Sequence, residues 1–224
     1  MIIACDTSSV VCSVAVSHHG QILEKWSDSG SQIHIEKLSP FLEQALRLCH
    51  SRTEGIDALA LAIGPGSFNG LRIGLANMKA LALSLNLPLI PISTIDAMAR
   101  GLGADVKRYG RGVVFSHRNY VHFADYDLKN WDPSKEREYF YGPWGDLLDS
   151  KIDFYFGTID RGLAEWLKGE GKPLAERFLN VKADASTVAL LAESRLAKEI
   201  PDLDQLEPFY NAIYEAKKWV PPQF

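Results

Sequence analysis

The chain has 224 residues, of which 46% are hydrophobic, and a formal net charge of −4. This length and apolar content allow one large domain or two small ones with proper cores. No stretch approaches the roughly 20 apolar residues of a membrane span, and the three cysteines form no Cys-x-x-Cys pair, so we expect a soluble protein of the cytoplasm without a membrane partner. The acidic balance provides no broad attraction for phosphate backbones, so any RNA contact should be local or depend on a partner.

The predicted elements begin with three strands, over Ile2–Asp6, Cys12–Ser17 and Gln21–Trp26. An amphipathic helix follows, because apolar residues recur at helical spacing from Leu38 to Cys49. Pro40 fits only the first turn of this helix or a kink, since proline has no N–H group to donate.

A glycine-rich loop, Gly64-Pro65-Gly66-Ser67-Phe68-Asn69-Gly70, separates an apolar strand, Ile56–Ile63, from an apolar helix, Leu71–Leu85. Glycine lets a backbone approach a ligand closely, and the first N–H groups of a helix point at it, so this arrangement is typical of an anion cradle. A strand over Pro88–Ile92 and a helix starting at Ser93-Thr94 follow. Three strands, a helix, a strand, a helix and a strand are the order of one lobe of the actin-like ATPase fold.

A second domain is predicted beyond Arg100. Its expected elements are a hairpin over 112–116 and 120–126, an irregular stretch over 129–145, a strand over 152–156, helices over 159–167 and 186–196, and a weak strand over 178–181. We therefore divide the chain into a first lobe (1–100), a second lobe (101–206) and a tail (207–224) that packs back on the first lobe.

The motifs of the first hundred residues resemble those of the bacterial TsaB (YeaZ) family. Six segments carry the resemblance: Asp6-Thr7-Ser8, Cys12-Ser13-Val14-Ala15, His34 ahead of Leu38 and Pro40, the block Gly64 to Gly74, Lys79-Ala80-Leu81-Ala82, and Pro88 to Thr94. The later chain departs from the family pattern at Ser116-His117-Arg118 and at Asn211-Ala212.

The resemblance implies an α/β protein of the actin-like ATPase (ASKHA, ribonuclease H-like) fold with two lobes, the second reduced and divergent. It also implies a non-catalytic subunit that binds TsaD, which transfers a threonylcarbamoyl group onto the tRNA adenosine next to the anticodon. The implied further partners are a TsaE-type ATPase and, when the chain is alone, a second copy of itself. The resemblance implies that tRNA is contacted only indirectly.

The residues at the expected catalytic positions agree with this inference. Catalytic relatives carry a His-x-x-x-His metal pair where this chain has Ser93-Thr94-Ile95-Asp96-Ala97-Met98. Asp6 is followed by Thr7-Ser8-Ser9, where ATP-hydrolysing members of the fold have Asp-x-Gly. The glycine-rich loop also matches neither a Walker A motif nor a nucleophile elbow.

We therefore expect no catalytic residue, no metal and no cofactor. Residual nucleotide or anion binding is expected at most, at a vestigial site made of Asp6, Thr7, Ser8, Gly64, Gly66 and Ser67. The alternative is an active enzyme on the same fold, either a small-molecule kinase or ATPase or a metallopeptidase-like enzyme.

The helix after the loop is apolar on nearly every side and must be covered on every side. Either a partner or the second domain and the C-terminal segment could cover its outer side, and the resemblance favours the partner. The predicted interface comprises His34, Leu38, Leu42, Leu71, Arg72, Gly74, Leu75, Met78, Lys79 and Ala82. We expect Leu75→Glu or Met78→Glu to abolish pairing while the monomer stays folded. The basic cluster Lys107, Arg108 and Arg111, with Lys217 and Lys218, is expected to be solvated surface rather than a tRNA site.

Overall fold

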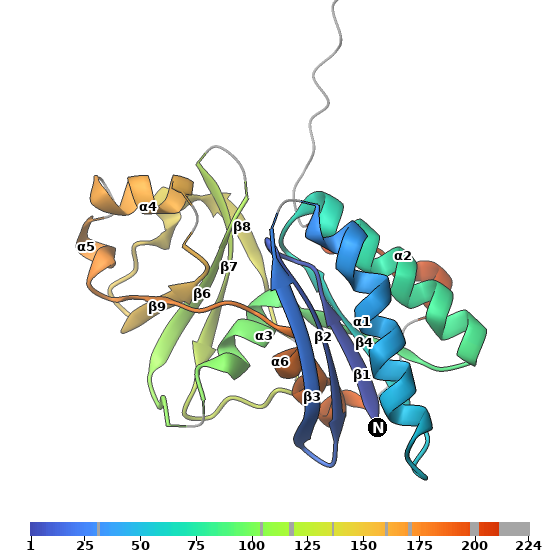
Figure 1. Cartoon of the computed structure of the whole chain (residues 1–224). Coiled ribbons are helices and arrows are strands. Elements are labelled where there is room, and N and C mark those ends of the chain that lie inside the picture. Colours follow the sequence, from blue (N-terminus) through green and yellow to red (C-terminus); the bar gives the residue numbers. More distant parts are fainter. Residues whose placement is uncertain are drawn as a thin grey trace, which may run out of the picture.

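Two five-stranded mixed sheets, one in each lobe, form the framework of the chain (Figure 1). The computed structural model describes residues 1–30, 32–103, 105–116, 119–135, 137–159, 161–169, 172–197 and 202–210. The predicted two-lobed α/β fold is confirmed. His117, Arg118 and the tail from Asn211 onward lie outside the described residues.

The first sheet has the strand order β3-β2-β1-β4-β5. The strand pairs β1–β2 and β2–β3 are antiparallel, whereas β1, β4 and β5 run parallel. The strands are β1 (Ile2–Asp6), β2 (Val11–His18), β3 (Gln21–Ser29), β4 (Ala58–Gly64) and β5 (Leu89–Ser93). All five were predicted, with limits that differ by up to three residues.

The second sheet repeats this topology, with the order β10-β9-β6-β7-β8. Again the first three strands in the chain are antiparallel and the last two are parallel to the first. The strands are β6 (Tyr109–Phe115), β7 (Tyr120–Asp127), β8 (Phe140–Pro143), β9 (Phe154–Gly157) and β10 (Phe178–Asn180). The prediction of an irregular stretch over 129–145 was wrong at its end, where β8 and the start of a 3-10 helix, Trp144–Leu147, form.

The second lobe is reduced chiefly in its outer helices, which are shorter than those of the first lobe. Its outer helices, α4 (Arg161–Lys168) and α5 (Lys172–Ala175), contain 8 and 4 residues, against 18 in each of α1 (Ile33–His50) and α2 (Phe68–Leu85). The predicted start of α1 at Leu38 was five residues late, and Pro40 lies inside the helix at an exposed position. Within the described residues, no helix combines the length and the apolar character that crossing a bilayer requires.

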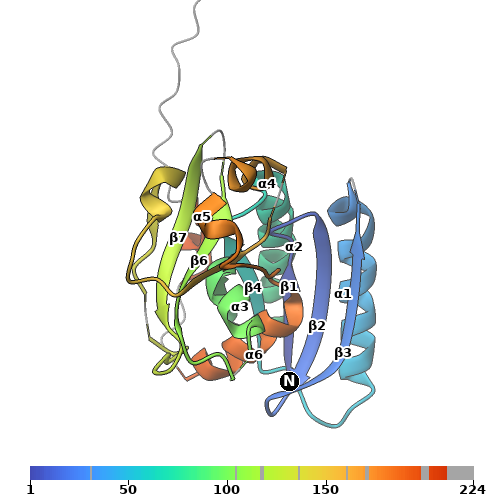
Figure 2. The same cartoon turned by 90° about the vertical axis from the view of Figure 1, so that its left-hand side faces the viewer.

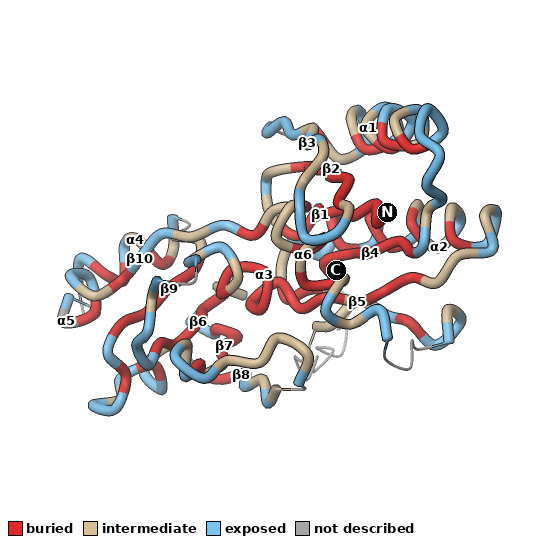
Figure 3. The backbone as a smooth tube through the Cα atoms, turned by 90° about the horizontal axis from the view of Figure 1, so that it is seen from below, coloured by how far each residue is buried: buried red, intermediate tan, exposed pale blue. Residues whose placement is uncertain are grey.

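The elements form five layers around three hydrophobic cores, one of which extends over both sides of the middle layer (Figures 2 and 3). Helices α1 and α2 cover the outer face of the first sheet, and α4 and α5 cover the outer face of the second. Two further helices, α3 (Thr94–Gly101) and α6 (Ala185–Arg195), lie between the sheets. The inner face of the first sheet is lined with small side chains, which lets these two helices approach closely: Ala4, Ala58, Ala60 and Ala62.

Helix α6 packs on the first sheet although the sequence analysis placed it in the second lobe. At its start, the backbone N–H of Ala185 donates a hydrogen bond to Oγ of Ser13 in β2, at 3.0 Å. Near its end, the Glu193 carboxylate accepts a hydrogen bond from Ser17, at 2.6 Å. The core on the inner face of the first sheet is therefore completed by α6, which lies almost 200 residues along the chain.

A buried carboxylate, Asp96 in α3, joins the layers at the centre of the molecule. Asp96 is 2% exposed and accepts hydrogen bonds from the hydroxyls of Tyr126, at 2.7 Å, and Tyr139, at 2.9 Å. The Arg195 guanidinium of α6 donates to the same carboxylate at 2.7 Å. Burial, together with the nearby carboxylate, raises the pKa of Tyr126 well above its usual value. One side chain thus holds together α3, α6 and the second sheet.

Replacing Asp96 by alanine should lower the free energy of unfolding by about 2–4 kcal/mol, because it leaves a guanidinium and two hydroxyls without their acceptor. Chemical denaturation measures this change. The matched control is Glu43→Ala, which breaks an exposed ion pair with Arg47 and should cost less than about 0.5 kcal/mol. Equal losses in the two variants would contradict a central role for Asp96.

Candidate functional site

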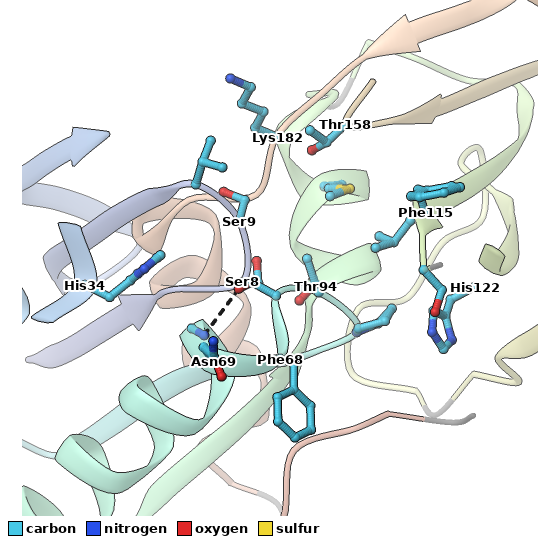
Figure 4. Close-up of a pocket in the computed structure, with 18 of the residues that line it drawn as sticks. Ser8, Ser9, His34, Phe68, Asn69, Thr94, Phe115, His122, Thr158 and Lys182 are labelled. Carbon is cyan, nitrogen blue, oxygen red and sulfur yellow. Dashed lines mark hydrogen bonds between the residues drawn. The ribbon is translucent and has the colours of Figure 1, made fainter. Parts of the chain in front are cut away.

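A cleft of about 1140 Å³ opens between the two lobes (Figure 4). Its walls form where parallel strands end, because the two sheets share a topology and turn these ends toward one another. Each of six such strands contributes a lining residue just beyond or near its carboxyl end: Ser8, Pro65, Thr94, Ser116, Thr158 and Lys182. Ligands of α/β proteins bind at this end of parallel strands. The cleft is therefore the candidate site.

The glycine-rich loop on the cleft floor is occupied by the chain's own β1–β2 turn. A Cβ atom built on Gly66 would lie 2.3 Å from the carbonyl oxygen of Ser8, and one on Gly70 would lie 2.1 Å from that of Thr7. The N–H of Ser67 donates to the Ser8 carbonyl at 2.7 Å, and the Thr7 hydroxyl donates to the Gly70 carbonyl at 2.8 Å. These glycines therefore serve close packing of α2 against the end of β1.

The described end of the chain closes the other side of this loop. The N–H of Phe209 donates to the carbonyl of Ile63 at 2.8 Å. A Cβ atom on Gly64, whose φ is +118°, would lie 2.6 Å from the Phe209 carbonyl oxygen. The next residue, Tyr210, packs against Phe68 at the start of α2, with ring centroids 5.2 Å apart and ring planes tilted by 31°. The segment 207–210 thus lies against the first lobe.

The residues of the predicted vestigial site gather around the end of β1 but differ in access. Ser8, Gly66 and Ser67 line the cleft, whereas Asp6 and Thr7 are fully buried behind it. One oxygen of Asp6 accepts a hydrogen bond from the N–H of Ser8 at 2.8 Å, and the other has no hydrogen-bond partner among the described residues. Burial raises the pKa of this carboxyl group. Anion binding by this set stays a prediction.

The residues of the predicted partner interface are mostly buried within the chain itself. Only Arg72 is exposed, and His34 and Lys79 are half-buried. His34 points toward the carbonyl of Val11, 3.3 Å away. The remaining seven face the chain's own core: Leu38, Leu42, Leu71, Gly74, Leu75, Met78 and Ala82. These seven residues lie on the inner sides of α1 and α2. A partner can therefore contact only the outer sides of the two helices.

This burial corrects the expectation for two of the proposed substitutions. Met78 is fully buried and Leu75 is 8% exposed, both in the core between α2 and the first sheet. A glutamate at either position would place an unpaired charge in an apolar core. We therefore expect Leu75→Glu and Met78→Glu to disrupt the monomer, so a loss of pairing in these variants would not identify the interface.

The predicted basic cluster is not a continuous surface patch. Arg111 is 5% exposed and forms a bidentate pair with Asp125, at 2.6 and 2.9 Å. The guanidinium of Arg108 lies over the Phe154 ring, 4.9 Å from its centroid. Both arginines therefore stabilise the second lobe. Among the described residues, no three His, Cys, Asp or Glu side chains come together in a way that could hold a metal ion.

The second wall of the cleft was not predicted from the sequence. Thr158, Asn180 and Lys182 lie on it, and none belongs to a recognised motif. Their strands are only 4 and 3 residues long, so the apolar pattern there is weak. The repeated strand order of the two lobes is the feature that locates them.

Replacing Gly70 by alanine should destabilise the chain, although glycine to alanine inside a helix normally gains up to about 1 kcal/mol. The reason is the contact of the new Cβ atom with the Thr7 carbonyl, which forces α2 away from β1. The matched control is Gly101→Ala at the end of α3, where the Cβ atom meets its neighbours at 3.6 Å or more. Thermal unfolding should show a loss of several degrees for Gly70→Ala and no loss for Gly101→Ala; a gain for Gly70→Ala would refute the close packing.

Comparisons with known proteins place this geometry in context. The family model described as "TsaD: tRNA N6-adenosine threonylcarbamoyltransferase" matches residues 28–111. Two proteins named "tRNA threonylcarbamoyladenosine biosynthesis protein TsaB" share 35% and 36% identity with the chain: that of Haemophilus influenzae over 99 residues and that of Escherichia coli over 100. These matches cover 44% and 45% of the chain, and 42% and 43% of the relatives. The matched part thus spans less than half the length of these two relatives.

Two comparisons extend over nearly the whole chain. The Bacillus subtilis protein of the same name is 25% identical over an alignment 234 residues long, gaps included, which covers 99% of each chain. The solved structure of YeaZ from Pseudomonas aeruginosa matches with a TM-score of 0.72 at 22% identity, covering 93% of this chain and 98% of that one. At this identity the structural likeness shows the fold, and both lobes take part in it.

Proposed function

The chain belongs to the TsaB (YeaZ) family, and from this membership we propose that it is a non-catalytic subunit in the synthesis of threonylcarbamoyladenosine in tRNA. Its partner in this proposal is a TsaD-type transferase, which carries out the chemistry. The helices α1 and α2 form the surface that meets this partner. The proposal rests on family likeness for the pathway and on the geometry of α2 for the surface.

The observation that carries the proposal is the two-sided character of α2. Its glycine side is pressed onto the end of β1, which fills the loop where a phosphate-binding member of this fold would need open backbone N–H groups. Its opposite side is uncovered within the described part of the chain. The glycine-rich segment therefore fixes a helix for presentation rather than holding a substrate.

The outward side of α2 is a stripe of exposed residues at helical spacing: Arg72, Ala76, Ala80 and Leu83. Leu83 is 69% exposed, as is Ile35 at the start of α1. The two helices are joined by the Ser39 hydroxyl, which lies 3.5 Å from the side-chain oxygen of Asn77. Small side chains flanked by exposed apolar ones favour close contact with the helices of another subunit. The exposed residues of the two helices named here are called the helical face: Arg72, Ala76, Ala80, Leu83, Ile35 and Ser39.

The proposal includes three further relationships that family likeness supports. A TsaE-type ATPase joins the assembly, and a second copy of the chain occupies the helical face when TsaD is absent. The tRNA reaches the assembly through TsaD, in keeping with the scattered, structurally engaged arginines of the second lobe.

The competing proposal is an active enzyme on the same fold, such as a small-molecule kinase, an ATPase or a metallopeptidase-like enzyme. Transfer of the threonylcarbamoyl group to tRNA, measured with the cognate TsaD-type and TsaE-type proteins, separates the two. We expect modification only when the chain is added to these proteins, and no turnover of ATP or peptide by the chain alone. Turnover by the chain alone, or full modification without it, would favour the enzyme.

A charge on the helical face should abolish pairing without unfolding the chain. Ala76→Glu introduces a carboxylate at an exposed position, so its cost in monomer stability should stay below about 0.5 kcal/mol. Its desolvation and repulsion at a closely packed interface should weaken binding to the TsaD-type transferase at least about a hundredfold. Gel filtration and calorimetric titration of the mixture measure this loss.

Two further variants control this experiment. Ala175→Glu makes the same change at an exposed position on α5, at the far end of the molecule (Figure 1), and should leave pairing unchanged. Met78→Glu, in the core beneath the helical face, should lose pairing together with its cooperative thermal transition. An intact complex with Ala76→Glu would rule out the helical face as the binding surface.

A further inference from the structure

The cleft between the lobes has a charge composition unlike that of the rest of the chain. The whole chain contains 28 acidic residues and a net charge of −4. None of the described residues that line the cleft is Asp or Glu, and they include Lys182, His34 and His122. Figure 4 places Lys182 at the rim with its side chain directed outward. The lining therefore carries no carboxylate and adjoins a cation at its mouth, which favours an anionic occupant. Asp6, which lies behind the wall, is fully buried, and burial raises the pKa of its carboxyl group.

Two buried hydroxyl groups in the wall of the cleft have unused hydrogen-bonding capacity. Thr94 is 1% exposed and Ser8 is 5% exposed, and both side chains lie in the wall of the cleft (Figure 4). Oγ1 of Thr94 has no hydrogen-bond partner among the described residues. Oγ of Ser8 has no partner with hydrogen-bond geometry there, although it interacts with the buried carboxyl group of Asp6. Buried polar groups nearly always have a hydrogen-bond partner, so hydroxyl groups without one in the wall of a cavity point to a ligand in that cavity.

Two helix N-termini at the cleft also favour an anionic ligand. Helices α2 and α3 both begin at the cleft, at Phe68 and Thr94. The positive ends of their dipoles therefore point into the region of the two hydroxyls. The remaining wall is mixed, and Met98, Phe115 and Ile159 supply apolar surface on it. The cleft thus offers donors at one place and an apolar surface around them.

We propose that this cleft binds a small organic carboxylate. The Ser8 and Thr94 hydroxyls donate to its carboxylate group, and its apolar body packs on Met98, Phe115 and Ile159. A carboxylate fits better than a phosphate ester, because the described wall holds no acidic residue to carry a magnesium ion and has its ammonium group only at the rim. Ser8 and Thr94 lie outside the helical face, although Ile35 borders both surfaces, so this inference stands apart from the proposed function.

The first test is calorimetric titration of the full chain with benzoate, a small rigid probe that has both a carboxylate and an apolar body. Benzamide, its neutral counterpart, together with inorganic phosphate and ADP with magnesium, completes the set. We expect heat of binding for benzoate and none for benzamide. Absence of binding by benzoate, or tighter binding of phosphate or ADP, would overturn the proposal.

The second test uses Thr94→Val, which keeps the shape of the side chain and removes the hydroxyl. Because that hydroxyl is buried without a partner, its removal should raise the melting temperature by about 2–4 °C while weakening benzoate binding at least about tenfold. Ser8→Ala should weaken binding in the same way. The control Thr53→Val, at an exposed loop position, should change neither quantity. Unchanged benzoate affinity in Thr94→Val would refute the assigned site.

Discussion

The contact of Gly66, just ahead of α2, and Gly70, in its first turn, with the end of β1 is the constraint on which the rest of the structure depends. No side chain separates the Thr7 and Ser8 carbonyl groups from Gly66 and Gly70, so the helix lies as close to the strand as the backbone allows. This approach fixes where α2 starts, lodges the β1–β2 turn in the loop and sets the floor of the cleft. It also fixes the direction in which the opposite side of α2 points. One packing contact therefore positions both the cleft and the helical face.

The sequence predicts the first lobe well because its elements are long or strongly patterned. The apolar strands β1 and β4 and the stripe along α1 give clear periodicities, and the glycine block marks the turn into α2. The start of α1 was placed too late because Pro40 is typical of a first turn, whereas an exposed proline in the second turn is tolerated here. The second lobe is less predictable. Its strands β8, β9 and β10 have only 4, 4 and 3 residues, too few for an alternating pattern to stand out.

The inward-facing side of α2 could not be predicted from the sequence, for a different reason. A helix that is apolar all round has no period that separates its inner from its outer side. The decision is made by the glycines, since Gly70 and Gly74 must face Thr7, and this turns Met78 and Ala82 inward as well. The cleft was equally hidden, because Thr94 and Lys182 become neighbours of one cavity only through the pairing of the two lobes. Both outcomes depend on tertiary contacts that no local pattern encodes.

The position of α6 between the sheets has a consequence for how the chain folds during its synthesis. Hydrogen bonds from Ala185 to Ser13 and from Ser17 to Glu193 close loops of 172 and 176 residues. The alanine-lined inner face of the first sheet therefore stays bare until nearly the whole chain has left the ribosome. Contacts of such sequence separation slow folding and prolong the exposure of apolar surface. The core beneath α1 and α2 needs only residues 1–89 apart from Leu206, so the two faces of the first sheet become covered at different times, the outer one early and the inner one late.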